Sequence, residues 1–193
     1  MTPETIKKIQ KLIGATQDGV WGPQSDKRLD AVLEANSHGG AQIPDSYWPM
    51  LSKIESNDRP YAKAAPSSGS GLYQFLRATW LGEGGQWGPD MTRAFGGYNP
   101  SAEEQLARAK TFTQKNADAL ATAGVAINRA TLYAAHFLGV GTAIRALNAA
   151  PGDPIESVTS EQQRKANPSI LPPGGRVIDF WRWLERKTGD KVQ

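Results

Sequence analysis

Glu55 is the residue whose position best suits acid chemistry. Trp48, Leu51 and Ile54 precede it at helical spacing, so we expect Glu55 at the rim of an apolar helix face. The segment 56–60 combines turn-forming residues with a proline, which predicts that the helix ends directly after Glu55. A carboxyl group that is partly withdrawn from water holds its proton more firmly and can donate it near neutral pH. Glu55 is therefore a candidate general acid, although the helix pattern alone fits an ordinary solvated side chain better.

A small, glycine-containing loop follows at 62–71, where backbone can approach a ligand closely. The pair Glu55-Ser56, the run Gly71-Leu72-Tyr73-Gln74-Phe75 and Thr79 resemble, in order and separation, the motifs of soluble lytic transglycosylases, which are relatives of goose-type lysozyme. The resemblance extends from 43 to about 147. It implies a lysozyme-like helical domain in which Glu55 is the catalytic acid and base. The implied substrate-binding residues are Ser56, Gly71, Tyr73 and Gln74.

A second candidate pair lies in the apolar stretch 130–139, which reads as a buried helix that is interrupted at 139–141 and resumes through 147. Tyr133 and His136 are three residues apart and therefore share a helix face. The segment is similar to a Tyr-x-x-His variant found in phage enzymes of the same family. That resemblance implies that both residues bind substrate near Glu55. The alternative is a satisfied core histidine beside a buried tyrosine.

The acidic residues near Glu55 in sequence, Asp58, Glu83 and Asp90, have no motif of their own and suit solvated charges better. Most glycosidases need two carboxylates, at about 5 Å for retention or about 6.5 to 9.5 Å for inversion. Lytic transglycosylases use one glutamate, with help from the acetamido group of N-acetylmuramic acid, and close a 1,6-anhydro ring. The resemblance implies cleavage of the β-1,4 bond between N-acetylmuramic acid and N-acetylglucosamine in peptidoglycan, and leaves the hydrolytic outcome open.

Residues 1–36 form a separate pattern of two short helices around the turn-rich segment 17–23, and 34–41 has the composition of a linker. The run Asp18-Gly19-Val20-Trp21-Gly22-Pro23 resembles the signature of small helical peptidoglycan-binding modules. Ser25 replaces the usual Thr, and we expect it to cap the following helix. The predicted domains are 1–36 and 43–193. A hairpin that packs on the larger domain is the alternative for the first.

Three further patterns describe the scaffold. Pro44 suits the first turn of the helix that carries Glu55, and Ser101 with Glu104 has the spacing of a capping box. The segment 176–187 reads as a helix with apolar residues on more than one face, which we expect to close the core. Its Trp and basic residues leave a weak contact with a membrane surface as the alternative.

The composition restricts the function classes. The 193 residues include no Cys and two His, so we expect no metal and no cofactor. The net charge of +3 permits attraction to a polyanion, but Lys and Arg are not clustered, so we expect no nucleic acid partner. We expect a mainly α chain, a monomer, and no signal peptide in Met1–Ile13.

The resemblance to phage enzymes completes the functional hypothesis. It implies a phage lysin made in the host cytoplasm that acts on the cell wall, in the periplasm, after release or as part of a virion. The alternative is a noncatalytic wall-binding or tail-structural protein with the same fold.

Overall fold

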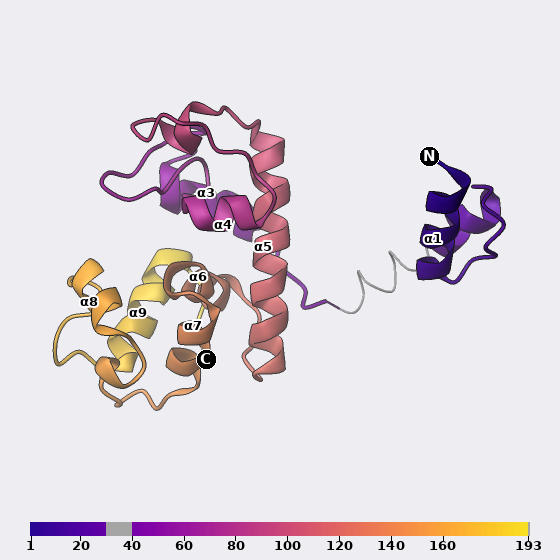
Figure 1. The fold of residues 1–193 in the computed structure, drawn as a ribbon. Coiled ribbons are helices and arrows are strands. Elements are labelled where there is room, and N and C mark those ends of the chain that lie inside the picture. Colours follow the sequence, from indigo (N-terminus) through magenta and orange to yellow (C-terminus); the bar gives the residue numbers. More distant parts are fainter. Residues whose placement is uncertain (30–39, 193) are drawn as a thin grey trace. The chain divides into compact units, whose positions relative to one another are not determined.

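The computed structural model describes residues 1–29 and 40–192, which divide into two compact units, Met1–Gly40 and Ala41–Gln193 (Figure 1). The described residues are mainly helical, as the sequence predicts, and contain isolated β-bridges but no strand. The division at 40–41 falls between the predicted domain limits of 36 and 43. Most of the predicted linker, and the apolar positions Val32 and Leu33, lie outside the described residues.

The first unit begins with α1 (Pro3–Ile13). The Thr2 side chain accepts a hydrogen bond from the Thr5 N–H, which satisfies one of the free donors at the start of the helix. Proline at the first helical position fits there because its missing N–H would have no partner within the helix. Gly14, in the left-handed region with φ 70°, ends the helix.

A buried glutamine joins α1 to the turn-rich loop and to the second helical segment, 23–29. The Gln10 amide donates to the Asp18 carboxylate at 2.8 Å and to the Ser25 hydroxyl at 3.1 Å, and its oxygen accepts from the Gly19 N–H at 3.0 Å. The expectation that Ser25 caps the second helix is wrong, because Ser25 lies inside the helical segment 23–29. Its hydroxyl instead accepts a hydrogen bond from the Gln10 amide.

In the second unit, Glu55 lies on α3 (Tyr47–Ser56). Pro44 is not in its first turn, because the Pro44 carbonyl accepts from the Tyr47 N–H in the turn that precedes the helix. Pro49 takes that place instead, where a missing N–H costs no helical bond. The helix ends directly after Glu55-Ser56, as predicted, because Asn57 adopts the left-handed conformation with φ 53°.

The loops after α3 fold around a cluster of aromatic rings together with α4 (Arg77–Gly82) and the 3-10 turn η1 (Ala94–Gly97). Trp80 and Phe95 are fully buried, with ring centroids 4.6 Å apart, and Phe75 meets Trp80 at 5.2 Å. Offset and edge-on aromatic contacts of this kind stabilise a core beyond the area that they bury. The cluster fixes the start of the 71–75 loop.

The long helix α5 (Ala102–Thr122) runs beside both parts of the second unit: Figure 1 shows α3 and α4 along its first half and α6 and α7 along its second. Ser101 caps it by accepting from the Glu104 N–H, as predicted. The reciprocal half of the expected capping box does not form, because the Glu104 carboxylate pairs with Arg108 at 2.8 Å.

The remaining elements form a second cluster around α6 (Arg129–Leu138) and α7 (Val140–Asn148). The predicted helix break is confirmed, but Gly139 alone leaves the helix, with φ 77°. The other elements are η2 (Ile155–Ser157), α8 (Glu161–Ala166) and α9 (Val177–Thr188).

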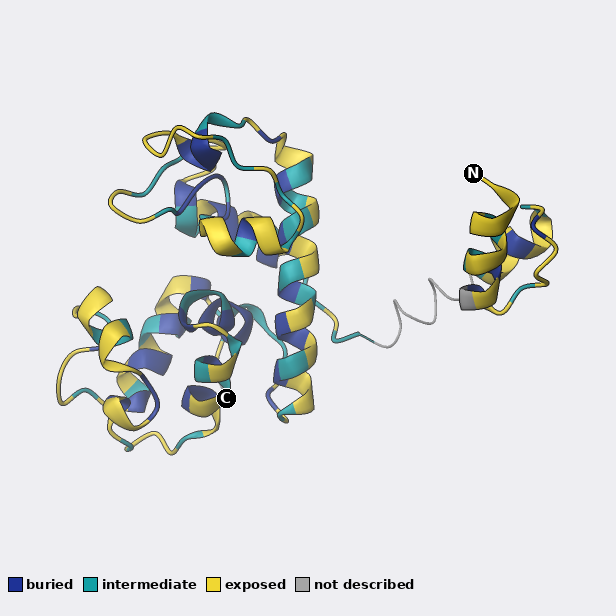
Figure 2. Ribbon diagram, in the orientation of Figure 1, coloured by how far each residue is buried: buried dark blue, intermediate teal, exposed yellow. Residues whose placement is uncertain are grey.

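The predicted role of α9 in closing the core is confirmed. Phe180 and Leu184 are fully buried, and the Trp181 indole donates to the Ala146 carbonyl at 2.9 Å. Figure 2 shows buried residues gathered on the facing sides of α6, α7 and α9. Within the described residues, no helix has the length and apolar character needed to span a membrane.

Candidate active site

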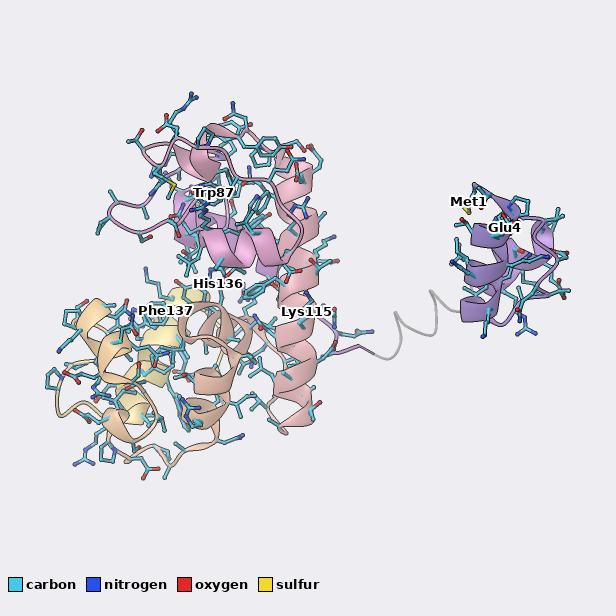
Figure 3. The ribbon with its side chains drawn as sticks, in the orientation of Figure 1. Met1, Glu4, Trp87, Lys115, His136 and Phe137 are labelled. Atoms are coloured by element: carbon cyan, nitrogen blue, oxygen red, sulfur yellow. The ribbon has the colours of Figure 1, made fainter. Side chains whose placement is uncertain are left out.

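Two elements far apart in sequence bring an acid and an imidazole together. Glu55, in the last turn of α3, lies with its Oε1 3.8 Å from the Nε2 of His136 on α6. The side chains are 18% and 16% exposed, so the pair is largely withdrawn from water but still open on one side. His136, labelled in Figure 3, lies on the side of α6 that faces α3. Such a position suits a carboxyl group that exchanges a proton with a bound ligand.

Tyr133 completes this side of the site. Its ring stacks on that of His136, with centroids 6.1 Å apart and planes at 13°, and on that of Trp183 at 5.7 Å. Burial first, then the charge of Glu55 and a hydrogen bond to it, raise the pKa of Tyr133 well above its ordinary value. The Tyr133 hydroxyl therefore stays protonated and acts as a donor to the Glu55 carboxylate.

His136 acts as a neutral group at neutral pH. Burial lowers the pKa of its imidazole, and the negative charge of Glu55 opposes that effect only in part. A neutral imidazole has one donor and one acceptor nitrogen, so it can hydrogen-bond a ligand or the carboxyl group without adding charge. The predicted face shared by Tyr133 and His136 thus points at Glu55.

Tyr47 is a neighbour of the site that the sequence analysis missed. It is fully buried at the start of α3, and burial first, then the charge of Glu55, raise the pKa of its hydroxyl. In the sequence it reads as one more apolar position of an amphipathic helix. The signal available was its phenol group on the same helix as Glu55, eight residues before it.

Gly71 and Gln74 shape the loop that follows α3. Gly71 has φ 80°, and a side chain there would meet Phe95 Cζ at 2.4 Å and Gln105 Oε1 at 2.3 Å, so only glycine fits. The Gln74 amide donates to the Gly71 carbonyl at 3.0 Å and to the Ala62 carbonyl at 3.3 Å. Both residues thus determine the path of the backbone.

Gln105, also missed by the sequence analysis, fastens this loop to α5. Its side chain is fully buried. Its oxygen accepts from the Leu72 N–H at 2.8 Å, and its amide donates to the carbonyls of Pro60 and Pro100 at 3.0 and 3.1 Å. A buried amide with every bond satisfied fixes the relative position of the segments that it joins. In the sequence Gln105 is a single polar residue in a helix, with no pattern to mark it.

The side chains of Ser56 and Tyr73 are both buried, and the Ser56 hydroxyl has a hydrogen-bond partner within the protein. The buried Ser56 hydroxyl donates to the Ser52 carbonyl at 3.1 Å, one turn earlier in the same helix. Tyr73 is buried, and desolvation first, then the charge of Asp58, raise the pKa of its hydroxyl. The structure brings Glu55, Tyr133 and His136 together. The substrate contacts of Tyr133 and His136 stay predictions, as do those of Ser56, Gly71, Tyr73 and Gln74.

The other acids considered in the sequence are each held by a neighbouring side chain: Asp58 by Lys53, Glu83 by Lys115 and Asp90 by Thr92. Of these, Asp90 has a pKa below its ordinary value because the Thr92 hydroxyl and N–H bond to its carboxylate. Within the described residues, no group of three His, Cys, Asp or Glu side chains could hold a metal ion. The carboxyl group of Glu55, with Tyr133 and His136 beside it, has the geometry for proton transfer to a bound ligand.

Comparison with known proteins adds no relative: the chain matches no family model, and no curated protein matches its sequence.

Proposed function

We propose that this chain cleaves the β-1,4 bond between N-acetylmuramic acid and N-acetylglucosamine in peptidoglycan, with Glu55 as general acid and base in a lysozyme-like helical domain. The observation that carries the proposal is the largely buried Glu55 carboxyl group facing Tyr133 and His136. The order and spacing of Glu55-Ser56 and Gly71-Leu72-Tyr73-Gln74-Phe75 add the resemblance to soluble lytic transglycosylases.

Proton transfer by Glu55 accounts for both steps of the reaction. Protonated Glu55 donates to the glycosidic oxygen as the bond from C1 breaks, while the acetamido oxygen of N-acetylmuramic acid stabilises C1. The resulting carboxylate then takes the proton of the C6 hydroxyl, whose oxygen bonds to C1 and closes the anhydro ring. Tyr133 and His136 orient the carboxyl group, because both are neutral hydrogen-bonding groups that face it.

The transglycosylase course is favoured over a hydrolase with two carboxylates. Asp58, Glu83 and Asp90 are bound to Lys53, Lys115 and Thr92, and such pairing leaves them poorly placed to act as a nucleophile or base. A single acid that acts twice needs no second carboxylate.

The biological setting follows from the same resemblance. The chain acts as a monomeric phage lysin, made in the host cytoplasm and directed at peptidoglycan in the periplasm, either as an endolysin or within a virion. The unit Met1–Gly40 serves as its wall-binding part. The buried Trp181 and the half-buried Trp183, which packs on Phe137 with centroids 4.9 Å apart, favour the core role of α9 over a membrane contact.

Digestion of purified peptidoglycan, followed by mass analysis of the products, tests the proposal. We expect fragments with 1,6-anhydro-N-acetylmuramic acid ends, which are lighter by one water than hydrolytic products. Reducing N-acetylmuramic acid ends would correct the course to hydrolysis. Intact glycan after prolonged incubation with folded protein would overturn the proposed activity and favour a noncatalytic wall-binding role.

A further inference from the structure

A hollow of about 230 Å³ lies beside the 71–75 loop. We call it the basic hollow, and its lining residues are Tyr61, Lys63, Thr92, Arg93, Ala94 and Asn99. They come from two segments, one shortly after α3 and the other around η1.

Both walls of the basic hollow are joined to the loop of the candidate site. On one side, the Ala62 carbonyl accepts from the Gly71 N–H at 2.9 Å, and Lys63 forms an isolated antiparallel bridge with Ser70. On the other, the Phe95 N–H donates to the Ser70 hydroxyl at 3.1 Å. The basic hollow is therefore fixed to Ser70 and Gly71 at the start of this loop, next to the segment that the resemblance assigns to substrate binding.

The lining has two cations and no acid. The Lys63 ammonium donates to the carbonyls of Ala64, at 2.8 Å, and Ser67, and among the described residues it has no carboxylate partner. Arg93 is exposed, and its guanidinium makes no hydrogen bond or ion pair to a described residue. The carboxylate of Asp90 acts on Arg93 at longer range and stays ionised, because the Thr92 hydroxyl donates to it at 2.6 Å. Neither cation of the lining is thus in direct contact with a carboxylate of the described residues.

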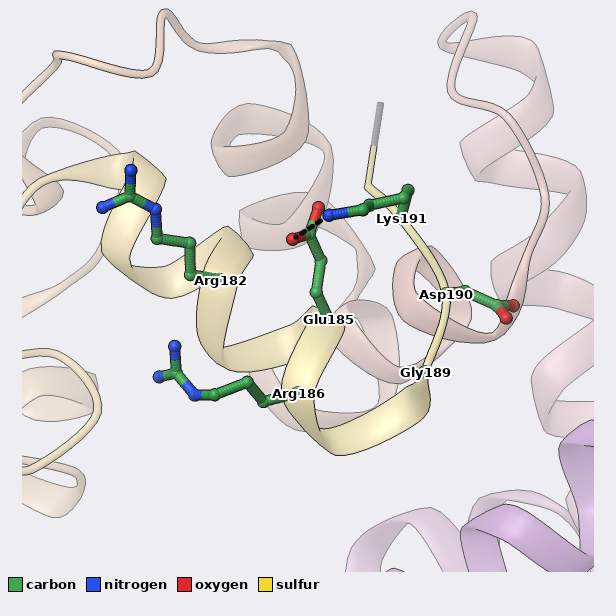
Figure 4. A pocket seen from close by; sticks show the side chains of 6 residues that line it. All are labelled: Arg182, Glu185, Arg186, Gly189, Asp190 and Lys191. Carbon is green, nitrogen blue, oxygen red and sulfur yellow. Dashed lines mark hydrogen bonds and ion pairs between the residues drawn. The ribbon is translucent and has the colours of Figure 1, made fainter.

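A hollow on α9 shows the opposite condition. Its lining residues are Arg182, Glu185, Arg186, Gly189, Asp190 and Lys191 (Figure 4). Lys191 pairs with Glu185 at 3.3 Å, the dashed contact in Figure 4, and Asp190 pairs with Arg129. Two of its six lining residues are acids, so an added anion meets negative as well as positive charge there, whereas the lining of the basic hollow contains no acid.

We infer that the basic hollow binds a carboxylate of the peptide stem carried by N-acetylmuramic acid, an inference that rests on the proposed function. The glycan backbone of peptidoglycan carries no carboxylate when each lactyl group is joined to its stem, whereas the stem carries several. Lys63 and Arg93 supply the charge, Asn99 an amide donor, and the exposed ring of Tyr61 an apolar wall. The enzyme therefore prefers glycan strands that keep their stems.

Binding to glycan strands with and without stems tests this inference. In the Glu55→Gln background, which cannot cleave, we expect stem-bearing strands to bind more tightly than strands freed of their stems by an amidase. Arg93→Gln should weaken binding of stem-bearing strands about three- to tenfold, because the guanidinium no longer pairs with the stem carboxylate. Arg93→Gln should also bring the ratio of the affinities for stem-bearing and stem-free strands close to one. Arg93→Lys should restore part of that ratio.

Arg186→Gln is the matched control, because it removes the same charge from an exposed position on α9. Equal weakening of both kinds of strand by Arg93→Gln, or equal weakening by Arg186→Gln, would overturn the inference, as would no change with Arg93→Gln. A parent chain that binds stem-bearing strands selectively but cleaves neither kind would overturn the proposed cleavage and leave the ligand of the hollow standing.

Discussion

The pairing of Glu55 with His136 illustrates which of two electrostatic effects prevails. The charge of Glu55 favours a protonated imidazole, whereas burial favours the neutral one, and burial has the larger effect on the pKa of His136. An imidazole kept neutral beside a carboxyl group is suited to hydrogen bonding rather than to an ion pair. A histidine that merely fills the core would be neutral as well, so the turnover of a His136 variant is what separates the two roles.

Replacing His136 by Phe tests that role. The ring volume is kept and the hydrogen bond is lost, so we expect turnover to fall by about 10 to 100-fold, a loss of roughly 1.4 to 2.7 kcal/mol in transition-state stabilisation. The melting temperature should change little, and Tyr133→Phe should show a smaller loss of the same kind. Equal activity per folded molecule in His136→Phe and the parent would remove His136 from the site.

The lowered pKa of His136 also predicts a pH dependence of stability. The unfolded chain binds a proton near the ordinary value of 6.5, whereas the folded chain resists that proton until a lower pH. The unfolded state thus binds more protons between these values, and stability falls as the pH falls below 6.5. We expect the unfolding free energy of the parent to drop relative to His136→Phe between about pH 7.5 and 5 in denaturant titrations. A difference that stays constant over that interval would contradict a lowered pKa.

The sequence predicts part of this residue-scale arrangement. Glu55 is marked by its place at a helix end, and Tyr133 and His136 by their shared face. Tyr47 and Gln105 belong to no pattern that predicts a role at the site. A tyrosine at an apolar helix position is typical of a core residue, and a lone glutamine is typical of a surface residue. Their roles depend on which segments meet in space, and the spacing of residues along one helix does not contain that information.

At the scale of elements, the 71–75 loop is held by close packing rather than by regular secondary structure. A Cβ at Gly71 would lie within 2.4 Å of Phe95 and Gln105, both of which are fully buried and unable to withdraw freely. The path of the loop therefore depends on the absence of a side chain at Gly71.

Gly71→Ala is therefore expected to lower the unfolding free energy by about 3 to 5 kcal/mol, from backbone strain and overpacking together. Gly124→Ala is the matched control, because Gly124 has a similar φ of 75° but nothing within 4 Å of the added Cβ. We expect it to cost only about 1 to 2 kcal/mol, the strain of the left-handed conformation. Equal losses in denaturant titrations of the two variants would show that packing around Gly71 is unimportant.

The positions of the longer helices could be read from the sequence, whereas the short helices α4 and α8 were not predicted. The errors have local causes. Helical spacing and a turn-rich segment place the end of α3, and Gly139 marks the break between α6 and α7. Pro44 misleads because Pro49 also satisfies the rule for the first turn. The capping box at Ser101 is half formed because Arg108, one turn beyond Glu104, competes for its carboxylate.

At the scale of the whole molecule, the chain consists of two units, each with its own internal contacts. The first is small, and a single buried amide, Gln10, links its helices through the loop. The sequence predicts this division from composition alone, because a polar, glycine-rich stretch separates two apolar patterns. It does not reveal what the first unit binds, since binding depends on the exposed surface rather than on the core pattern.

A chain beginning at Ala41 tests the contribution of the first unit. If Met1–Gly40 attaches the enzyme to the wall, the shortened chain should keep its melting temperature and its rate on soluble glycan fragments. It should also co-sediment less readily with intact sacculi. Co-sedimentation and thermal unfolding measure the two properties separately. A lower melting temperature with unchanged sedimentation would instead favour a hairpin that supports the core of the larger unit.

The most direct test of the central claim is the rate at which Glu55→Gln degrades purified sacculi, measured per folded molecule. The substitution keeps the shape of the side chain and removes its exchangeable proton, so we predict a loss of about 100-fold to 10,000-fold with unchanged circular dichroism. Glu161→Gln, which removes an exposed carboxylate from α8, should leave the rate unchanged. A Glu55→Gln variant that retains a tenth or more of the parent rate would contradict the assignment of Glu55 as the catalytic acid.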